Sequence, residues 1–483
     1  MRLSAADLCA LAPLAVLGLA ALLTTGVTAF WRRHGLVAGL AVLGLLAAEA
    51  LAPGAAAVAP RRIGVLLVID AFALFYIRLL VSAGVIVAAL AYDYLSVREG
   101  EREEFYILLL LAVLGGSILV ASAHLASLFL GLELLSISLY VLIAYLRTSP
   151  HGLEAGVKYL ILAGASSAFL LFGMALLYAA TGTLELGRLA EGLVTAEGRL
   201  LLLGGMALLL TGLGFKLAVV PFHMWTPDVY QGAPAPVTAL LATVSKGAVL
   251  ALLLRLFAPT TLHAGSPLWW LLATVATASM IVGNLLALLQ ENVKRILAYS
   301  SIAHLGYMLV ALLAGGSRAV EAVTFYLAAY FVTILGAFGV VGVLSGLAAE
   351  AERLDEYRGL LWRHPWLATF FAAILFSLAG IPLTAGFMAK FYVFAAGAAS
   401  ALWGLVLVVA LTSALGLFYY LRVIVVMFGS PAESRTEEPG AARVTISLAG
   451  RLALGLLALL LLWLGTYPSP LVQLIQRVAA GLA

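Results

Sequence analysis

Hydrophobic residues run along the chain in long stretches separated by short polar joints. A run of about 20 apolar residues is long enough to cross a bilayer as an α-helix. Period-two alternation, which a membrane β-barrel requires, is missing. The pattern therefore predicts an all-α polytopic membrane helix bundle with about fourteen spans, whose ends are approximate: 8–30, 35–52, 71–95, 104–121, 124–146, 155–180, 199–219, 236–257, 267–289, 293–313, 319–347, 366–398, 402–428 and 448–467.

Two of these spans contain residues that break helices. In the seventh span Pro221 follows Lys216 by five residues, and in the twelfth Pro382 precedes Lys390. Proline removes a backbone donor and clashes with the preceding turn, so we expect both helices to be interrupted. Irregular backbone at membrane depth is tolerated only where protein buries it or water lines it, and matching breaks in two halves indicate ion sites in transporters. We expect the break beside Lys216 to admit water.

The broken spans are five helices apart, which predicts two repeats of five helices within a single membrane domain, 1–483. Residues 1–100 would hold the first three helices, 104–257 the first repeat, 267–428 the second repeat and 448–467 the last helix. Each repeat has its proline-broken helix in fourth place. Because five is odd, the two repeats would be inverted in the membrane.

Composition agrees with the hydrophobic pattern and excludes several classes of function. Hydrophobic residues make up 64% of the chain and charged residues only 10%. The net charge is +4, but no block of basic residues is long enough to form a nucleic-acid-binding patch. A single cysteine, Cys9, excludes an intramolecular disulfide, a multi-cysteine metal site or an iron–sulfur cluster held by this chain alone. We expect no nucleic acid, metal or cofactor to bind here.

Basic loop residues predict the orientation, because cytoplasmic loops of membrane proteins are enriched in Lys and Arg. Loops after odd-numbered spans hold thirteen basic residues: Arg32, Arg33, Arg98, Arg102, Arg147, Lys294, Arg295, Arg353, Arg358, Arg363, Arg435, Arg443 and Arg451. The opposite side, which includes both termini, holds seven: Arg2, Arg61, Arg62, Arg188, Arg199, Arg318 and Arg477. Both termini are therefore predicted to be outside, in the periplasm of a bacterium.

Lysine is rare in this chain, and its positions are unusual. Four of the five lysines fall inside or at the edge of predicted spans six, seven, eight and twelve, where a charge costs about 2.5 to 3.5 kcal/mol; these four are Lys158, Lys216, Lys246 and Lys390. Arginine stays protonated, whereas an ammonium withdrawn from water can exchange a proton near neutral pH. The lysines are therefore candidate proton relays; snorkelling to an interface or static ion pairing is the alternative.

Glu133 adds a carboxylate in the middle of the fifth predicted span. A lysine on a neighbouring helix would offset the cost of this charge, and each group would then set the proton affinity of the other. Glu154 and Lys158 are spaced i,i+4, as expected for an ordinary surface pair. Further groups that could hold relay waters, or else only join helices by hydrogen bonds, are His223, His304, Tyr299, Tyr307, Ser300 and Ser301.

The residues around these positions resemble a known family. The stretches HLASLFLGLELLSISLY, GLGFKLAVVPFHMWTPDVYQGAPAPVTALLATVSK, NVKRILAYSSIAHLGYMLVAL and SLAGIPLTAGFMAKFYVF closely resemble subunit N of respiratory complex I, the proton-translocating NADH-quinone oxidoreductase, in a bacterial form. The resemblance covers nearly the whole chain. It implies an antiporter-like membrane-arm subunit in the bacterial inner membrane, which translocates protons coupled to quinone reduction in other subunits. Its partners would be other membrane-arm subunits and lipid. NADH, FMN, iron–sulfur clusters and quinone would belong to partner subunits.

The resemblance also implies roles for individual residues. The family's buried glutamate falls on Glu133, the lysine of its broken seventh helix on Lys216, its central relay on Lys246 and the lysine nearest the outward exit on Lys390. Lys158 matches the pattern as well. Two alternatives remain: an Mrp-type cation/proton antiporter, which shares the fold and the lysines, and a structural scaffold whose buried charges only lock helices together. The segment TPDVYQGAPAPV favours subunit N.

Overall fold

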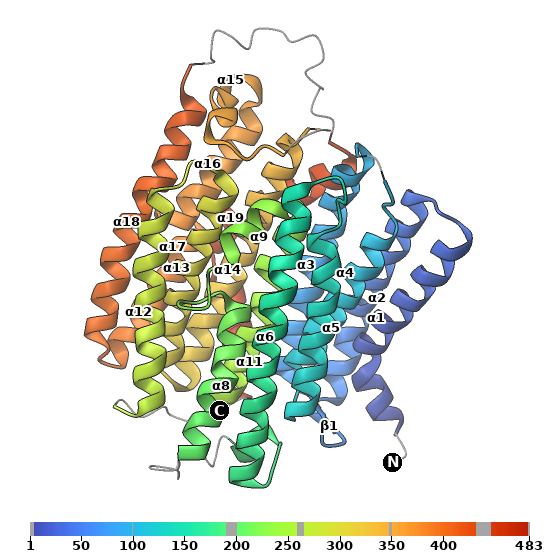
Figure 1. Cartoon of the computed structure of the whole chain (residues 1–483), viewed down its shortest axis with the longest axis vertical. Coiled ribbons are helices and arrows are strands. Elements are labelled where there is room, and N and C mark those ends of the chain that lie inside the picture. Colours follow the sequence, from blue (N-terminus) through green and yellow to red (C-terminus); the bar gives the residue numbers. More distant parts are fainter. Residues whose placement is uncertain are drawn as a thin grey trace.

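The computed structural model describes residues 4–98, 100–189, 200–257, 265–346, 350–430 and 446–481. These form one bundle of helices running along a common direction (Figure 1). The long helices are α1 Ala5–Phe30, α2 His34–Val58, α3 Ala71–Ser96, α4 Glu104–Val120, α5 Leu125–Ile143, α6 Pro150–Thr181, α8 Leu200–Leu217, α11 Lys246–Phe257, α12 Pro267–Leu288, α13 Val293–Leu313, α14 Gly316–Leu344, α16 Pro365–Ala379, α17 Ala385–Ala399, α18 Trp403–Phe428, α19 Leu448–Thr466 and α20 Ser469–Ala480.

Short elements join these helices. They are the antiparallel hairpin of β1 Arg61–Ile63 and β2 Leu67–Ile69, the helical turns α9 Thr226–Gly232, α10 Ala235–Leu240 and α15 Leu360–Arg363, the π-helical turn η1 Leu241–Ser245 and the 3₁₀ turn η2 Leu354–Tyr357. The sequence pattern predicted neither the hairpin nor the C-terminal helix α20.

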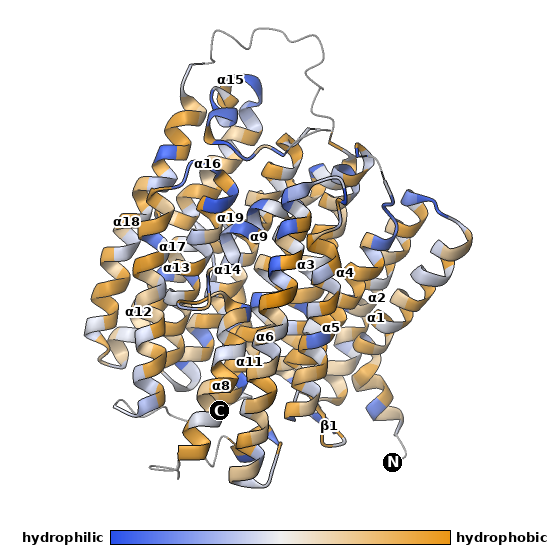
Figure 2. Cartoon of the chain, viewed as in Figure 1, coloured by the Kyte–Doolittle hydropathy of each residue, from blue (hydrophilic) through white to orange (hydrophobic). Residues whose placement is uncertain are grey.

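Twelve helices of the described chain are long and apolar enough to cross a membrane, with α10, η1 and α11 counted as one. The short apolar helix α4 and the broken pair α16 and α17 complete the fourteen predicted spans. The polytopic helical fold is therefore confirmed. Figure 2 shows the hydrophilic residues gathered mainly at the helix ends, and few of them along the middle.

Burial separates a central group of helices from a peripheral one. In the most apolar stretch of each span, the share of residues that are buried is 100% for Ala235–Phe257 and 94% for α13, but only 28% for α18. Figure 1 places α14 in the centre, with α18 at one edge and α1 and α2 at the other. A charge on a central helix is therefore removed from lipid as well as from water.

Both chain ends lie on the side of the β-hairpin, and α15 lies on the opposite side (Figure 1). This is what an even number of crossings requires. Four of the basic residues used to predict the orientation lie outside the described residues: Arg2, Arg199, Arg435 and Arg443.

Both predicted helix breaks are confirmed. α8 ends at Leu217 and α9 begins only at Thr226, with Pro221 between them. α16 ends at Ala379 and α17 begins at Ala385; here Gly380 takes a left-handed conformation, with φ of +87°, that glycine adopts without strain.

The first two helices of each predicted repeat pack closely in the same way. A methyl group added at Gly115 of α4 would lie 2.8 Å from the carbonyl oxygen of Gly131 on α5. A methyl group at Gly306 of α13 would lie 2.8 Å from the carbonyl oxygen of Ala276 on α12. Glycine permits this near-contact of backbones in both halves, as packed membrane helices commonly require.

The second break depends on a close backbone approach at Gly386. Its amide donates to Ser377 Oγ (2.9 Å), and a methyl group there would lie 1.8 Å from the Ser377 carbonyl oxygen. We expect Gly386→Ala to separate α17 from α16 and to destabilise the protein by about 3 kcal/mol, the upper end for overpacking. Thermal unfolding of the assembled enzyme in mild detergent measures this. Gly404→Ala is the matched control, because its added methyl would meet no described atom within 4 Å outside its own helix backbone and chain neighbours; equal effects would contradict the prediction.

Candidate functional site: a row of buried lysines

Lys216 lies in the last turn of α8, before the first break, and is 2% exposed. Its Nζ donates to Ser136 Oγ on α5 at 2.7 Å. Glu133, one turn earlier on α5, accepts a 2.5 Å hydrogen bond from Ser167 of α6. Among the described side chains, Glu133 and Lys216 form no direct ion pair. The predicted coupling therefore has a different geometry: the Lys216 ammonium of α8 contacts α5 at Ser136, one turn after the Glu133 carboxylate.

Lys246 is the first residue of α11 and is fully buried. It directly follows the π-helical turn η1, a local insertion that is frequent at functional sites. Its Nζ donates to Ser301 Oγ on α13 at 2.5 Å, and the hydroxyl of Tyr330 on α14 donates to the same oxygen at 2.6 Å. The hydroxyl of Tyr230 on α9 lies 3.4 Å from it. Ser301 is therefore a shared contact for one ammonium and two phenols.

His304, one turn after Ser301 on α13, continues this polar group. Its Nδ1 lies 2.7 Å from the hydroxyl of Tyr326 on α14, and its Nε2 lies 3.2 Å from that of Tyr420 on α18. Tyr420 also hydrogen bonds to Ser300, the residue beside Ser301. A neutral imidazole has one donor and one acceptor nitrogen, so it can pass a proton between two hydroxyls.

Lys390 lies on α17 after the second break and is 6% exposed. Its Nζ donates to the carbonyl oxygen of Ala379 (2.8 Å) and to Ser413 Oγ on α18 (2.7 Å). Ala379 is the last residue of α16, so the ammonium interacts with a helix C-terminus, where positive charge is favoured. The Tyr307 ring centroid lies 5.5 Å from Nζ, close enough for a cation–π contact.

A chain of side chains joins the surroundings of Lys390 to those of His304. Asn284 donates to the hydroxyl of Tyr307 (3.1 Å) and accepts from that of Tyr419 (3.1 Å). The ring of Tyr419 packs on that of Tyr420, with centroids 4.3 Å apart. The structure thus brings Lys246, His304 and Lys390 into one region filled with hydroxyl groups.

Lys158 does not belong to this buried row. Its side chain is 42% exposed and forms ion pairs with Glu154 (2.6 Å) and Asp228 (2.8 Å), so the predicted surface pair with Glu154 is confirmed. Asp228 also pairs with Arg295 at 2.8 Å. Burial acts to raise the pKa of Asp228, but hydrogen bonds from Lys158 and Arg295 outweigh it and hold that pKa below its ordinary value. In this chain, Lys158 has the contacts of a charged surface residue.

The two remaining relay candidates are less connected. His223 lies in the first break and is buried, and within the described structure its Nδ1 has no hydrogen-bond partner. Tyr299, on α13, is partly buried and shares no hydrogen bond with the described members of the lysine row. Across the described residues, no group of three His, Cys, Asp or Glu side chains converges as a metal site would require.

A cavity of about 210 Å³ adjoins the first break. We expected water to enter here, but the lining is apolar and consists of residues of α8, the break and helices α11, α12 and α13, such as Leu217, Pro221 and Phe222. The hydroxyl of its one polar side chain, Thr211, donates to the carbonyl oxygen of Ala207. A buried water needs two to four polar partners, so this lining does not support the expectation.

Several buried polar groups were not recognised from the sequence pattern. Lys294 was counted among the loop charges at the start of the predicted span 293–313, but its side chain in the first turn of α13 has 0% exposure. Tyr326 and Tyr330, which contact His304 and Ser301, are spaced i,i+4 on α14. This spacing could have been noticed, because it places two phenols on one face of an apolar helix.

Comparison with known proteins assigns the chain to a family. Residues 122–416 match the family model described as NADH:quinone oxidoreductase/Mrp antiporter, TM. The NADH-quinone oxidoreductase subunit N of Ectopseudomonas mendocina is 48% identical over 99% of this chain and 98% of its own length.

Solved structures agree with this assignment. A chain of respiratory complex I from Thermus thermophilus, determined with bound aureothin, superposes with a TM-score of 0.81 at 35% identity, covering 95% of this chain and 98% of that one. A chain of the Mrp complex from Dietzia sp. superposes with a TM-score of 0.84 over 98% and 97%, but at 22% identity it shows the fold alone. This multi-pass membrane chain therefore belongs to the NADH-quinone oxidoreductase subunit N family.

Proposed function

We propose that the chain is a membrane-arm subunit of a proton-translocating NADH-quinone oxidoreductase, and that its buried lysines carry the protons. One observation supports this most directly: three lysines, Lys216, Lys246 and Lys390, are buried in the bundle, and each donates to a serine hydroxyl. A static lock would be served by carboxylate partners. A hydroxyl is a weak partner that both accepts and donates protons, so it can pass a proton on.

Transfer would begin at Glu133 and Lys216. A charge displaced in a neighbouring subunit would change the interaction between these two groups, and Lys216 would release its proton toward Lys246. From Lys246 the proton would pass through Ser301 and the phenols and imidazole around His304 to Lys390. Waters would fill the steps that lack a direct contact. Lys390, beside the second break, would release the proton outward.

The redox chemistry would take place elsewhere in the complex. The fold superposes on a chain of respiratory complex I, and we propose that other subunits of such a complex hold NADH, FMN, iron–sulfur clusters and quinone. This chain would contribute no cofactor ligand. Its ends would face the periplasm, and its two five-helix sets, 104–257 and 267–428, would be inverted repeats of one domain. The 48% identity to a subunit N, against 22% to the Mrp chain, favours this role over an Mrp-type antiporter.

Lys216→Ala in the assembled enzyme tests the proposal. We expect pumping in inverted membrane vesicles to fall by about tenfold or more, because a proton-transferring group contributes a factor of this size or larger. Assembly is checked by the presence of this chain in the purified complex, and NADH oxidation with an artificial acceptor, which bypasses the membrane arm, checks the rest of the enzyme. Unaltered pumping would refute the proposed route. Lost pumping in a fully assembled enzyme would exclude a purely structural scaffold.

A further inference from the structure

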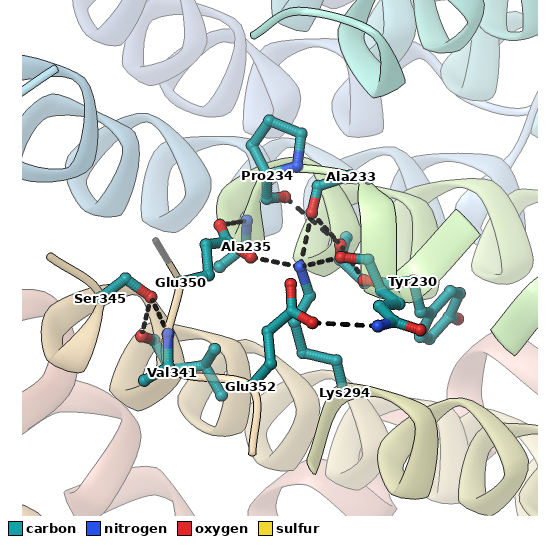
Figure 3. A network of polar contacts seen from close by, with 12 residues as sticks. Tyr230, Ala233, Pro234, Ala235, Lys294, Val341, Ser345, Glu350 and Glu352 are labelled. Atoms are coloured by element: carbon teal, nitrogen blue, oxygen red, sulfur yellow. Dashed lines mark hydrogen bonds and ion pairs between the residues drawn. The ribbon is translucent and has the colours of Figure 1, made fainter. Parts of the chain in front are cut away.

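A second buried charge cluster lies away from the lysine row, at the joint between α9 and α10 (Figure 3). Lys294, with 0% of its side chain exposed, pairs with Glu350, whose side chain is 12% exposed. Lys294 Nζ also donates to the carbonyl oxygens of Gln231 (2.8 Å) and Ala233 (2.7 Å). These three acceptors use all three donors of the ammonium.

The two carbonyls belong to the end of a helix. α9 ends at Gly232 and is capped by Ala233, so the carbonyls of Gln231 and Ala233 have lost the partners that a continuing helix would provide. A cation is favoured at such an end, because the helix C-terminus carries partial negative charge. Lys294 therefore caps α9.

Glu350 serves the helix that follows. Its Oε1 accepts a 2.9 Å hydrogen bond from the amide of Ala235, the first residue of α10, and another from the hydroxyl of Tyr94 on α3. A carboxylate is favoured at a helix N-terminus for the opposite electrostatic reason. One buried ion pair thus caps the end of α9 and the start of α10 together, and Figure 3 shows both groups directed at this joint.

The capped helix leads directly to the central relay lysine. α10 continues through the π-helical turn η1 into α11, whose first residue is Lys246, and every residue of the run Ala235–Phe257 is buried except Arg255, which is partly buried. Lys294 and Ser301 are seven residues apart on α13, which places them on one face two turns apart. One face of α13 therefore contacts both the joint between α9 and α10, through Lys294, and Lys246, through Ser301.

We propose that the Lys294–Glu350 ion pair is a positioning device: it fixes the start of α10, and with it the π-helical turn, so that Lys246 is held against Ser301. This inference rests on the proposed function of Lys246. Neither residue would carry a transferred proton. The segment that holds Glu350 is anchored independently, because the amide of Val293 donates to the Glu352 carbonyl oxygen (2.7 Å) and that of Leu354 to the Glu291 carbonyl oxygen (2.9 Å).

Glu350→Gln in the assembled enzyme is the test. It keeps the size of the side chain but removes the charge that caps α10 and neutralises Lys294. We expect the number of protons pumped per NADH oxidised to fall at least about threefold, a factor typical of coupled neighbouring groups. Glu352→Gln is the matched control, because Glu352 lies in the same segment and bonds to Gln231 and Asn292 side chains, but contacts neither Lys294 nor the α10 amide in the described structure.

A double-mutant cycle with Ser301→Ala separates positioning from general stability. If the ion pair acts through the contact between Lys246 and Ser301, Glu350→Gln should reduce pumping no further once Ser301 is absent. The inference would be overturned if the double variant lost pumping by the product of the two single losses. Wild-type pumping in Glu350→Gln, or an equal loss of pumping in Glu352→Gln, would also overturn it. If Glu350→Gln does not assemble, Tyr94→Phe removes one hydrogen bond to Glu350 and leaves both charges; unaltered pumping there would overturn the inference.

Lys246→Arg distinguishes failure of this inference from failure of the proposed function. If Lys246→Arg stops pumping while Glu350→Gln does not, the relay stands and the positioning role is wrong. If Lys246→Arg pumps normally, the relay itself is wrong, and the positioning role fails with it.

Discussion

Replacing Lys246 by methionine should stop proton pumping in an enzyme that still assembles and still oxidises NADH with an artificial acceptor. Methionine has about the same length and suits the buried site, but it holds no proton. Lys246 is fully buried and donates to Ser301 alone in the described structure, so no carboxylate or second ammonium is bonded to it as a substitute. We expect a loss of about 10²-fold or more, as for removal of a general acid or base.

Lys246→Arg is the informative companion to this variant, because a guanidinium keeps the positive charge but does not release its proton near neutral pH. Both variants should therefore fail to acidify inverted vesicles. Normal pumping by the arginine variant would show that only charge is needed at this position, and would contradict a transfer of protons through it.

Replacing Asp70 by alanine should have the largest effect on stability. Asp70 caps α3 through a 2.7 Å hydrogen bond from the Ala73 amide and binds Arg255 of α11 with both oxygens, at 2.8 and 2.9 Å. The side chain of Arg255 is only 10% exposed. Its unpaired charge should cost about 3–5 kcal/mol, and the lost cap about 1 kcal/mol. Thermal unfolding of the purified complex in mild detergent measures the loss.

The control for this prediction is Glu101→Ala, which breaks an ion pair with Arg32 whose side chains are 53% and 58% exposed. An exposed pair contributes about 0–1 kcal/mol, so this variant should unfold close to the wild-type temperature. Equal destabilisation by the two variants would show that burial of Arg255 does not determine the effect.

The membrane helices could be predicted because a bilayer imposes a simple length and composition on each span. The breaks at Pro221 and Pro382 followed from covalent chemistry, since proline cannot donate the helical hydrogen bond. The β-hairpin and α20 were missed because neither is a long apolar run. The burial of Lys294 was missed because this residue follows a polar joint and directly precedes an arginine, as a loop charge does. Its partner in the ion pair, Glu350, lies 56 residues later in the chain.

The burial of Lys216, Lys246 and Lys390 could be predicted, because a charge within a long apolar run is costly in lipid and therefore faces the interior of the bundle. Ser301 was among the candidate relay groups, but the pairing of each lysine with its serine could not be predicted. Ser136, Ser301 and Ser413 lie on helices that only the tertiary fold brings near. Lys158 was grouped with them by span position, although its side chain lies on the outside of the bundle in this chain.

The apolar cavity at the first break has a consequence for energy conservation. A membrane that stores a proton-motive force must not leak, and an opening lined by hydrocarbon is an insulator for ions. Because this apolar cavity lies beside Pro221, the backbone can be irregular near Lys216 without opening a proton-conducting path between the two aqueous phases. Polar substitutions in this lining would therefore threaten the tightness of the membrane before they affected catalysis.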